Sequence, residues 1–226
     1  MADIQHELVP GAGLDIIGGV EAEPRRRIYR MAKRCLDIAA TLAAAPVVLP
    51  VVGVAALLIR IEGGPAFYSQ MRVGKDGQVF RMWKLRSMRP NAAQMLEEYL
   101  EKCPEARCEW ELHQKLRQDP RITKLGRFLR KYSLDELPQL WNVFAGQMAL
   151  VGPRPFLPEQ RSQYPGYEYY SMRPGLTGLW QVSERNNCTF AERALHDTRY
   201  AKMMSFGTDI KIMIKTVAVV INGTGH

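Results

Sequence analysis

The longest apolar stretch of the chain lies between Ile38 and Ile59, where no position carries a charged side chain. As a helix this stretch would be about 33 Å long, enough to cross the hydrocarbon core of a bilayer. Pro46 and Pro50 lie near its middle, and each removes a backbone donor and favours a kink or a break. The pattern therefore predicts a membrane-inserted helix over residues 25–62 that is bent near its centre.

Basic residues lie on both sides of this stretch. Arg25, Arg26, Arg27, Arg30, Lys33 and Arg34 precede it, and Arg60, Arg72, Lys75, Arg81, Lys84 and Arg86 follow it. Lys and Arg concentrate on the cytoplasmic side of membrane segments, so both ends carry the signature of the same side. A re-entrant hairpin, which enters and leaves through one face, satisfies both flanks. A kinked spanning helix is the alternative.

The next part of the chain predicts one hairpin followed by helices. Residues 66–88 form two short strands around Lys75-Asp76-Gly77, because Asp-Gly supplies the positive φ that tight hairpins require. Residues 91–118 have helical propensity and are interrupted at Pro104. Residues 123–133 space their apolar positions on one face of a basic amphipathic helix, suited to a membrane surface or to core packing.

The chain closes on a strongly apolar helix over residues 209–222. The expected fold class is thus α+β and mostly helical, with a re-entrant membrane helix hairpin and a small cytoplasmic domain that carries a β-hairpin and amphipathic interfacial helices. We expect that catalytic domain to cover residues 63–226. Residues 1–24 lack the basic start of a secretory signal and are expected to form a mobile tail.

The charge of the chain predicts an anionic partner. The net charge is +8 and the isoelectric point is near 9.4. Nucleic acid, an acidic lipid surface and phosphate-bearing substrates all fit this charge, and the apolar stretch argues against nucleic acid. Cys35, Cys103, Cys108 and Cys188 form no CxxC pair, so reduced thiols are expected rather than a structural zinc site.

Two adjacent acids, Asp135 and Glu136, lie at an expected helix start. Ser133 and Glu136 have capping-box spacing, so helix capping is the ordinary explanation, while Asp135 as N-cap would place Pro138 in the first turn. In either register the helix dipole would favour the ionised carboxylates. An ionised carboxylate is what a nucleophile or a divalent-cation ligand must be.

An arginine in a conformationally restricted loop follows this pair in the sequence. Arg154 lies between Pro153 and Pro155, and a guanidinium held in such a loop suits bidentate phosphate binding, although a rigid turn with a paired arginine is the simpler alternative. Lys84 and Arg86 add basic side chains on the second arm of the hairpin. Together with the acidic pair they fit phosphoryl transfer with Mg²⁺, which depends on positioning and charge neutralisation.

At these residues the chain resembles the bacterial sugar transferase family, the monotopic polyprenyl-phosphate phosphoglycosyl transferases. The resemblance covers roughly residues 30–222. It rests on the segments KRCLDIAAT, GGPAFYSQMRVGKDGQVFRMWKLRSM, DPRITKLGRFLRKYSLDELPQLWNVFAGQMALVGPRP and RPGLTGLWQV. The block from Asp119 to Pro155 is the most specific of these.

The resemblance implies an enzyme that uses Mg²⁺ and a UDP-sugar. It implies that a covalent phosphosugar forms on Asp135, that the nucleoside monophosphate leaves, and that the phosphosugar passes to undecaprenyl phosphate. Glu136 would be the likeliest metal ligand, with Asp135 beside it, and Arg154 would bind phosphate. Lys84, Arg86 and Asp197 would support the substrate or the active site. For Asp197 a solvent-facing acid on a helix is the ordinary explanation.

The resemblance also bears on the membrane element and the sugar. The family's membrane helix is re-entrant and broken near a proline, here Pro46, but the position before it is Ala45 where members often have Ser. The chain is similar to the short, catalytic-domain form, and its closing VVINGTG resembles the exopolysaccharide-initiating galactose-1-phosphate transferases. UDP-galactose or UDP-glucose is therefore expected as donor, at the bacterial inner membrane with the domain on its cytoplasmic face. A catalytically silent, membrane-anchored interaction protein is the rival function, and homo-oligomers are possible.

Overall fold

The computed structural model describes residues 22–113, 116, 118–183 and 190–223. Its elements are α1 (Ala22–Ile61), β1 (Phe67–Val73), η1 (Lys75–Gly77), β2 (Val79–Leu85), α2 (Ala92–Lys102), α3 (Pro104–His113), α4 (Lys124–Lys131), η2 (Leu134–Glu136), α5 (Gln139–Phe144), β3 (Ala149–Val151), η3 (Pro158–Gln163), η4 (Glu168–Ser171), β4 (Gly175–Thr177), α6 (Leu179–Ser183), α7 (Phe190–Met203) and α8 (Phe206–Ile221). The expected tail over residues 1–24 lies mostly outside the described part, and α1 already begins at Ala22.

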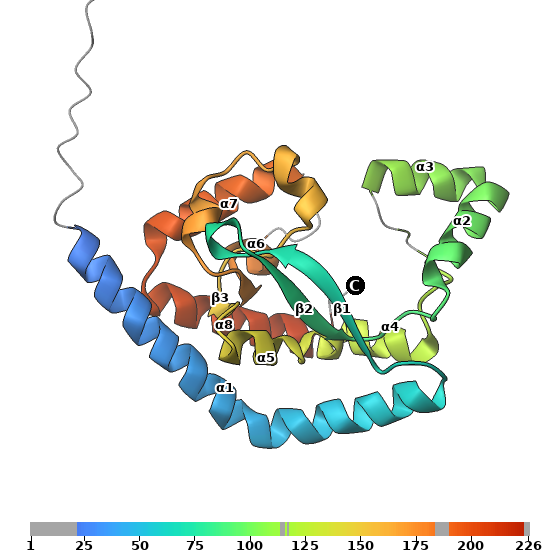
Figure 1. Ribbon diagram of the computed structural model, residues 1–226, viewed down its shortest axis with the longest axis horizontal. Helices are drawn as coiled ribbons and strands as arrows, with labels where there is room; N and C mark the ends of the chain where they lie inside the picture. The colour runs from blue at the N-terminus through green and yellow to red at the C-terminus, as the bar shows by residue number, and fades with distance from the viewer. Residues whose placement is uncertain (1–21, 114–115, 117, 184–189, 224–226) are drawn as a thin grey trace, which may run out of the picture.

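The apolar stretch forms one long helix, α1, which bends partway along its length (Figure 1). Pro46 and Pro50 both lie inside it, where each removes a hydrogen bond of the helix ladder. Its most apolar window has a mean hydropathy of 2.6, and only 11% of that window is buried. The core helix of a water-soluble protein would be mostly buried, so this helix has the length and the exposed apolar surface of a membrane segment.

The first half of α1 is tied to the globular body by polar contacts. Lys33 Nζ and the Tyr29 hydroxyl each donate to Oδ2 of Asp209, at 2.7 Å, and Asp209 is a buried residue of α8. The backbone N–H of Leu150 donates to Oδ1 of buried Asp37 at 3.3 Å. These contacts fix the start of the helix on the body.

The second half of α1 is tied to the same body by apolar packing. Ala55 and Ile59 are buried against Ala66, Leu85 and Leu129, which come from the hairpin and from α4. Both halves of the apolar helix therefore contact one globular domain, although the helix bends away between them (Figure 1).

The hairpin and the two helices after it agree with the sequence-based expectations. Strands β1 and β2 pair antiparallel around η1, where Asp76 and Gly77 have φ of 55° and 75°. Helix α2 ends before Pro104, which opens α3, and the two helices form an arm that stands away from the rest (Figure 1). The basic amphipathic pattern gives α4, where Thr123 Oγ1 accepts from the backbone N–H of Gly126 as its N-cap.

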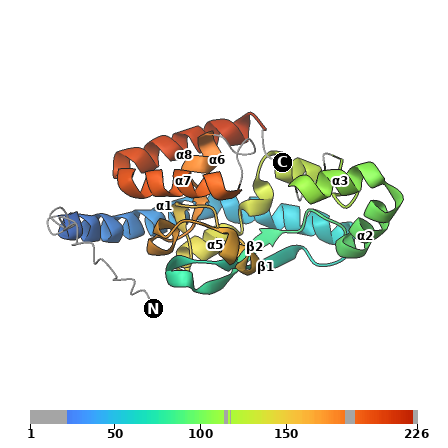
Figure 2. The ribbon, with the colours of Figure 1, turned by 90° about the horizontal axis from the view of Figure 1, so that it is seen from above.

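A second small sheet was not expected from the sequence. Strands β3 and β4 pair in parallel, and a side chain at Gly175 would collide with the backbone of Gly152, which directly follows β3. The hairpin lies on one side of α5 and helices α6, α7 and α8 lie on the other (Figure 2). Helices α4, α5 and α8 form a row between α1 and the remaining elements (Figure 1). Each exposes large apolar side chains, among them Phe128, Trp141, Phe144, Ile214 and Val217.

Candidate active site

The two adjacent acids lie in η2, a single 3-10 turn between α4 and α5. Ser133 precedes this turn in the left-handed region, with φ of 54°, and its side chain makes no capping bond, so the capping-box interpretation is wrong. Asp135 is not an N-cap either, because α5 begins only at Gln139. The two carboxylates are thus held by the tight turn itself.

Glu136 is fixed by two cations. Its Oε1 accepts from Lys84 Nζ at 2.7 Å and from Arg154 Nη2 at 3.2 Å. Burial raises the pKa of Glu136, but the charges of Lys84 and Arg154 and their hydrogen bonds outweigh this and hold the pKa well below its usual range. Glu136 is therefore ionised and immobile at neutral pH.

Asp135 has a different environment, although it is the adjacent residue. Its side chain is buried, and within the described part of the chain it accepts no hydrogen bond. Burial raises its pKa, the charge of Glu136 adds to this, and Lys84, Arg130 and Arg154 oppose it. Burial therefore acts against the ionised form of Asp135 that the sequence led us to expect.

The cations around the pair come from three parts of the fold. Lys84 reaches Glu136 from β2, and Arg154 reaches it from the loop after β3. Arg130, on the last turn of α4, is a further cation close to Asp135, with its Nε donating to Ser87 Oγ at 2.8 Å. Arg130 does not stand out in the sequence, because the amphipathic pattern of this helix explains it equally well as a solvated residue.

Two more arginines lie near Arg154 and were also missed. Arg72 of β1 donates to the Pro155 carbonyl at 3.3 Å, and Arg193 of α7 donates to the Arg154 carbonyl at 2.8 Å. Burial, together with the charges of Arg154 and Arg193, lowers the pKa of Arg72 to about 10. Its buried Nε has no hydrogen-bond partner among the described residues. The three guanidinium groups repel one another, and a multiply charged anion bound between them would relieve this repulsion.

Asp197 lies behind this arginine cluster and is buried, so the solvent-facing interpretation is wrong. Its Oδ2 accepts from the Tyr164 hydroxyl at 2.6 Å. Burial raises the pKa of Asp197 to about 6, against the opposing hydrogen bond from Tyr164 and the charge of Arg193. Asp197 therefore supports Arg193 and Tyr164, and through Arg193 the loop that carries Arg154.

Arg86 is not brought to the acidic pair. Its Nη2 donates to the carbonyls of Gly63 and Ile59, at the end of α1, so that it joins the hairpin to the membrane helix. Of the residues singled out from the sequence, Asp135, Glu136, Lys84 and Arg154 lie together, and Asp197 supports them from behind. Arg86 directly follows β2 and lies apart from them, at the end of α1.

The residues around the acidic pair could hold a divalent cation only together with substrate phosphates and water. The described residues contain no group of three or more His, Cys, Asp and Glu side chains that could enclose a metal. Mg²⁺, however, is usually held by one or two carboxylates together with substrate phosphates and water. Both cations on Glu136 contact Oε1, which leaves its other oxygen and the Asp135 carboxylate for such a role.

Comparison with known proteins gives the family. The sequence model for bacterial sugar transferases matches residues 28–223. The chain is 45% identical over 198 residues to the UDP-galactose-lipid carrier transferase of Erwinia amylovora, covering 87% of this chain and 42% of that protein. It is 44% identical over 202 residues to the undecaprenyl-phosphate galactose phosphotransferase of Salmonella typhimurium, covering 88% and 42%.

A third relative is similar along most of its own length. The exopolysaccharide production protein ExoY of Rhizobium meliloti is 40% identical over 203 residues, which are 88% of this chain and 90% of that protein. The chain thus spans less than half the length of the first two relatives and most of the third. The extent of the family match leaves no ambiguity: this chain belongs to the bacterial sugar transferase family.

Proposed function

We propose that the protein is a phosphoglycosyl transferase that moves a sugar 1-phosphate from a UDP-sugar to undecaprenyl phosphate. A covalent phosphosugar on Asp135 links the two halves of this reaction, which begins the assembly of an exopolysaccharide repeat unit. The names of two relatives support a UDP-galactose donor and an undecaprenyl-phosphate acceptor. A relative from Escherichia coli with 34% identity is a UDP-glucose:undecaprenyl-phosphate glucose-1-phosphate transferase, so UDP-glucose is the second candidate.

The observation that carries this proposal is the unequal pairing of the two acids. Glu136 is held by Lys84 and Arg154, whereas the Asp135 carboxylate has cations nearby but no hydrogen bond from the described residues. A carboxylate with unused lone pairs beside fixed positive charges is suited to attack an electrophilic phosphorus. If the two acids had only a structural role, both carboxylates would be expected to form ion pairs with the neighbouring cations.

The proposed chemistry balances in two displacements. A carboxylate oxygen of Asp135 attacks the phosphorus that bears the sugar, the bond from this phosphorus to the bridging oxygen breaks, and UMP leaves with that oxygen. A phosphate oxygen of undecaprenyl phosphate then attacks the same phosphorus and frees the Asp135 carboxylate. Arg154, with Arg72 and Arg193 beside it, binds the diphosphate and stabilises the charge that develops on its oxygens.

Mg²⁺ remains part of the proposal. Asp135 and the second carboxylate oxygen of Glu136 would hold it together with the diphosphate, and it would neutralise charge on the leaving UMP. Lys84 keeps Glu136 in place for this role, since its Nζ lies 2.7 Å from Oε1.

We also propose that α1 is re-entrant and that the body lies on the cytoplasmic face of the inner membrane. Polar contacts of Lys33 and Asp37 and apolar packing of Ala55 and Ile59 both join α1 to the same body. A straight spanning helix would separate these contacts on opposite sides of the bilayer. The basic residues on both flanks support the cytoplasmic side.

Mass spectrometry of the purified protein in detergent tests the covalent step. The protein is mixed with Mg²⁺ and single UDP-sugars without any lipid acceptor, and UMP release is followed in parallel. We expect a hexose-phosphate adduct on the peptide that contains Asp135, with one UMP released per adduct. The sugar that gives the adduct identifies the donor.

Two variants make this result specific. Asp135→Asn should give neither adduct nor UMP, while Asp76→Asn, a change at an exposed acid of the hairpin turn, should behave as the unaltered protein. UMP release that appears only after undecaprenyl phosphate is added, with no adduct, would indicate direct transfer and reject Asp135 as nucleophile. No turnover with any donor would favour a catalytically silent interaction protein.

A further inference from the structure

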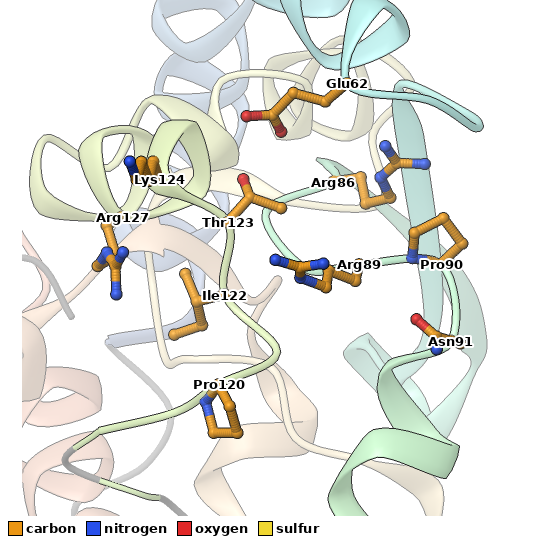
Figure 3. A pocket seen from close by; sticks show the side chains of 10 residues that line it. All are labelled: Glu62, Arg86, Arg89, Pro90, Asn91, Pro120, Ile122, Thr123, Lys124 and Arg127. Atoms are coloured by element: carbon orange, nitrogen blue, oxygen red, sulfur yellow. The ribbon is translucent and has the colours of Figure 1, made fainter.

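A basic cavity of about 530 Å³ lies beside the end of the membrane helix. Figure 3 shows Arg86 and Arg89 on one side of it, Lys124 and Arg127 of α4 on the other, and Glu62 above. Its lining therefore includes four basic side chains and one carboxylate. Such an excess of positive charge in a hollow attracts an anion with more than one negative charge.

The cations of this cavity are available to a ligand. Arg89, Lys124 and Arg127 are exposed, and no ion pair of theirs is found among the described residues. Arg86 lies deeper and is held by its Nη2 on the carbonyls at the end of α1, while its buried Nη1 has no hydrogen-bond partner in the described part of the chain. An unpaired buried donor costs free energy unless a ligand or water satisfies it.

The cavity lies where the protein meets the membrane. Glu62 directly follows α1, and Arg86 is bonded to the carbonyl of Ile59, the last buried apolar residue of that helix. Helix α4 packs Leu129 against Ile59 and exposes Phe128. A head group held in the cavity could therefore keep its hydrocarbon tail alongside α1.

The cavity also adjoins the acidic pair through two elements. Lys84 lies near the end of β2 and Arg86 follows directly after this strand, so the two are only two positions apart, about 7 Å of extended backbone. On α4, Arg127 is one helical turn before Arg130, the cation near Asp135. Ser87 lies between the two sites, because its hydroxyl accepts from Arg130 and its carbonyl accepts from the backbone N–H of Thr123.

We propose that this cavity binds the phosphate monoester of the polyprenyl-phosphate acceptor as it approaches Asp135 from the membrane. The inference rests on the proposed function and adds the place where the acceptor binds. A phosphate monoester carries up to two charges and three terminal oxygens, which matches several converging cations better than the single charge of a phosphodiester lipid. The donor diphosphate has its own cations at Arg72, Arg154 and Arg193.

Separate measurement of the two half-reactions tests this assignment. In the double variant Arg89→Gln/Arg127→Gln we expect UMP release and adduct formation without acceptor to stay unchanged. The KM for undecaprenyl phosphate should rise at least about tenfold, since charge-assisted hydrogen bonds to the acceptor are lost. Both residues are exposed, so the fold should tolerate the change. Arg107→Gln, an exposed arginine on the α2–α3 arm, is the matched control and should leave both quantities unchanged.

A binding experiment tests whether the cavity prefers undecaprenyl phosphate or a bulk anionic phospholipid. Asp135→Asn protein in nanodiscs of neutral phospholipid is titrated with undecaprenyl phosphate, and bound lipid is counted by native mass spectrometry. We expect one lipid per protein, lost in the Arg89→Gln/Arg127→Gln background. A tenfold excess of phosphatidylglycerol should not displace it. Displacement at equal concentration would assign the cavity to bulk anionic phospholipid and overturn the proposal.

The kinetic results also distinguish failure of the acceptor-site assignment from failure of the proposed function. An unchanged KM for the acceptor, or an equal loss in both half-reactions, would overturn the assignment while the covalent mechanism stands. If the unaltered protein forms no adduct at all, the proposed function fails, and the nanodisc titration still decides whether the cavity binds a polyprenyl phosphate.

Discussion

Asp135 and Glu136 are neighbours in the chain, yet their carboxylates meet opposite surroundings. Two hydrogen-bonded cations keep Glu136 charged, whereas burial favours the neutral form of Asp135. In the proposed mechanism Asp135 must be ionised to attack phosphorus. The rate of UMP release should therefore fall as the pH falls through the raised pKa of Asp135. Lys84 opposes this rise most strongly among the neighbouring charges.

Replacing Lys84 should therefore change the pH profile as well as the rate. In Lys84→Met we expect the acid limb of UMP release to move to higher pH, because the pKa of Asp135 loses its main lowering charge. The measurement is single-turnover UMP release between pH 5 and pH 9. Arg81→Met, on the same strand and exposed, should leave the limb in place. An acid limb that is identical in Lys84→Met and the unaltered protein would contradict this assignment.

Asp197 gives a prediction for stability. Its pKa is about 6 in the fold, above the unfolded value of about 3.9. A carboxyl with a raised pKa contributes stability below its unfolded pKa, and this contribution is lost as the pH rises through the folded value. Asp197→Asn removes this titration and retains an oxygen that accepts from Tyr164.

We accordingly expect the melting temperature of the unaltered protein to fall relative to Asp197→Asn between pH 4.5 and pH 7. The difference in unfolding free energy should change by about 2 kcal/mol over this range. Thermal unfolding in detergent, followed by intrinsic fluorescence, measures it. The control Asp76→Asn should track the unaltered protein at every pH. A constant offset between Asp197→Asn and the unaltered protein would show that Asp197 stays ionised throughout.

At the scale of elements, α1 depends on its bend to keep both of its contact regions on one body. Lys33 holds its first half on α8, and Ile59 holds its second half on the hairpin and α4. Pro46 and Pro50 lie between these two anchors. Removal of both prolines restores two backbone donors and favours a straighter helix.

We expect both ends of α1 to face the cytoplasm, and the proline pair to be required for this. In a cysteine-free background, Arg27→Cys and Glu62→Cys should both react with an impermeant maleimide only from the cytoplasmic face. In Pro46→Ala/Pro50→Ala, part of the Arg27→Cys population should react from the opposite face. Gly53→Ala is the control in the same stretch, since its added methyl group meets open space. Labelling of the two ends from opposite faces before any proline is changed would establish a spanning helix.

At the scale of the whole molecule, local signals were enough to predict the outline. Asp76-Gly77 predicted the hairpin, Pro104 predicted the division between α2 and α3, and the charge-free stretch predicted α1. Such features act through a few neighbouring residues, so one sequence contains them. The family resemblance is confirmed by the family match.

Features that depend on residues far apart in the sequence could not be predicted from local sequence signals. Strands β3 and β4 have three residues each, too few for a recognisable alternation. Arg72 and Arg193 join Arg154 only because β1, α7 and the loop after β3 meet in space. The burial of Asp197 and the raised pKa of Asp135 are also results of tertiary packing, which capping rules do not describe.

The bend of α1 has a mechanical consequence for the bilayer. A helix that enters and leaves through one face occupies area in a single leaflet, and the exposed apolar side chains of α4, α5 and α8 would add to this on the same face. Unequal area between leaflets favours curvature towards the wider one, and such insertion is sensitive to lipid packing. Lateral tension in the membrane would then change how deeply the protein sits, and with it how easily a lipid phosphate reaches Asp135 and Glu136.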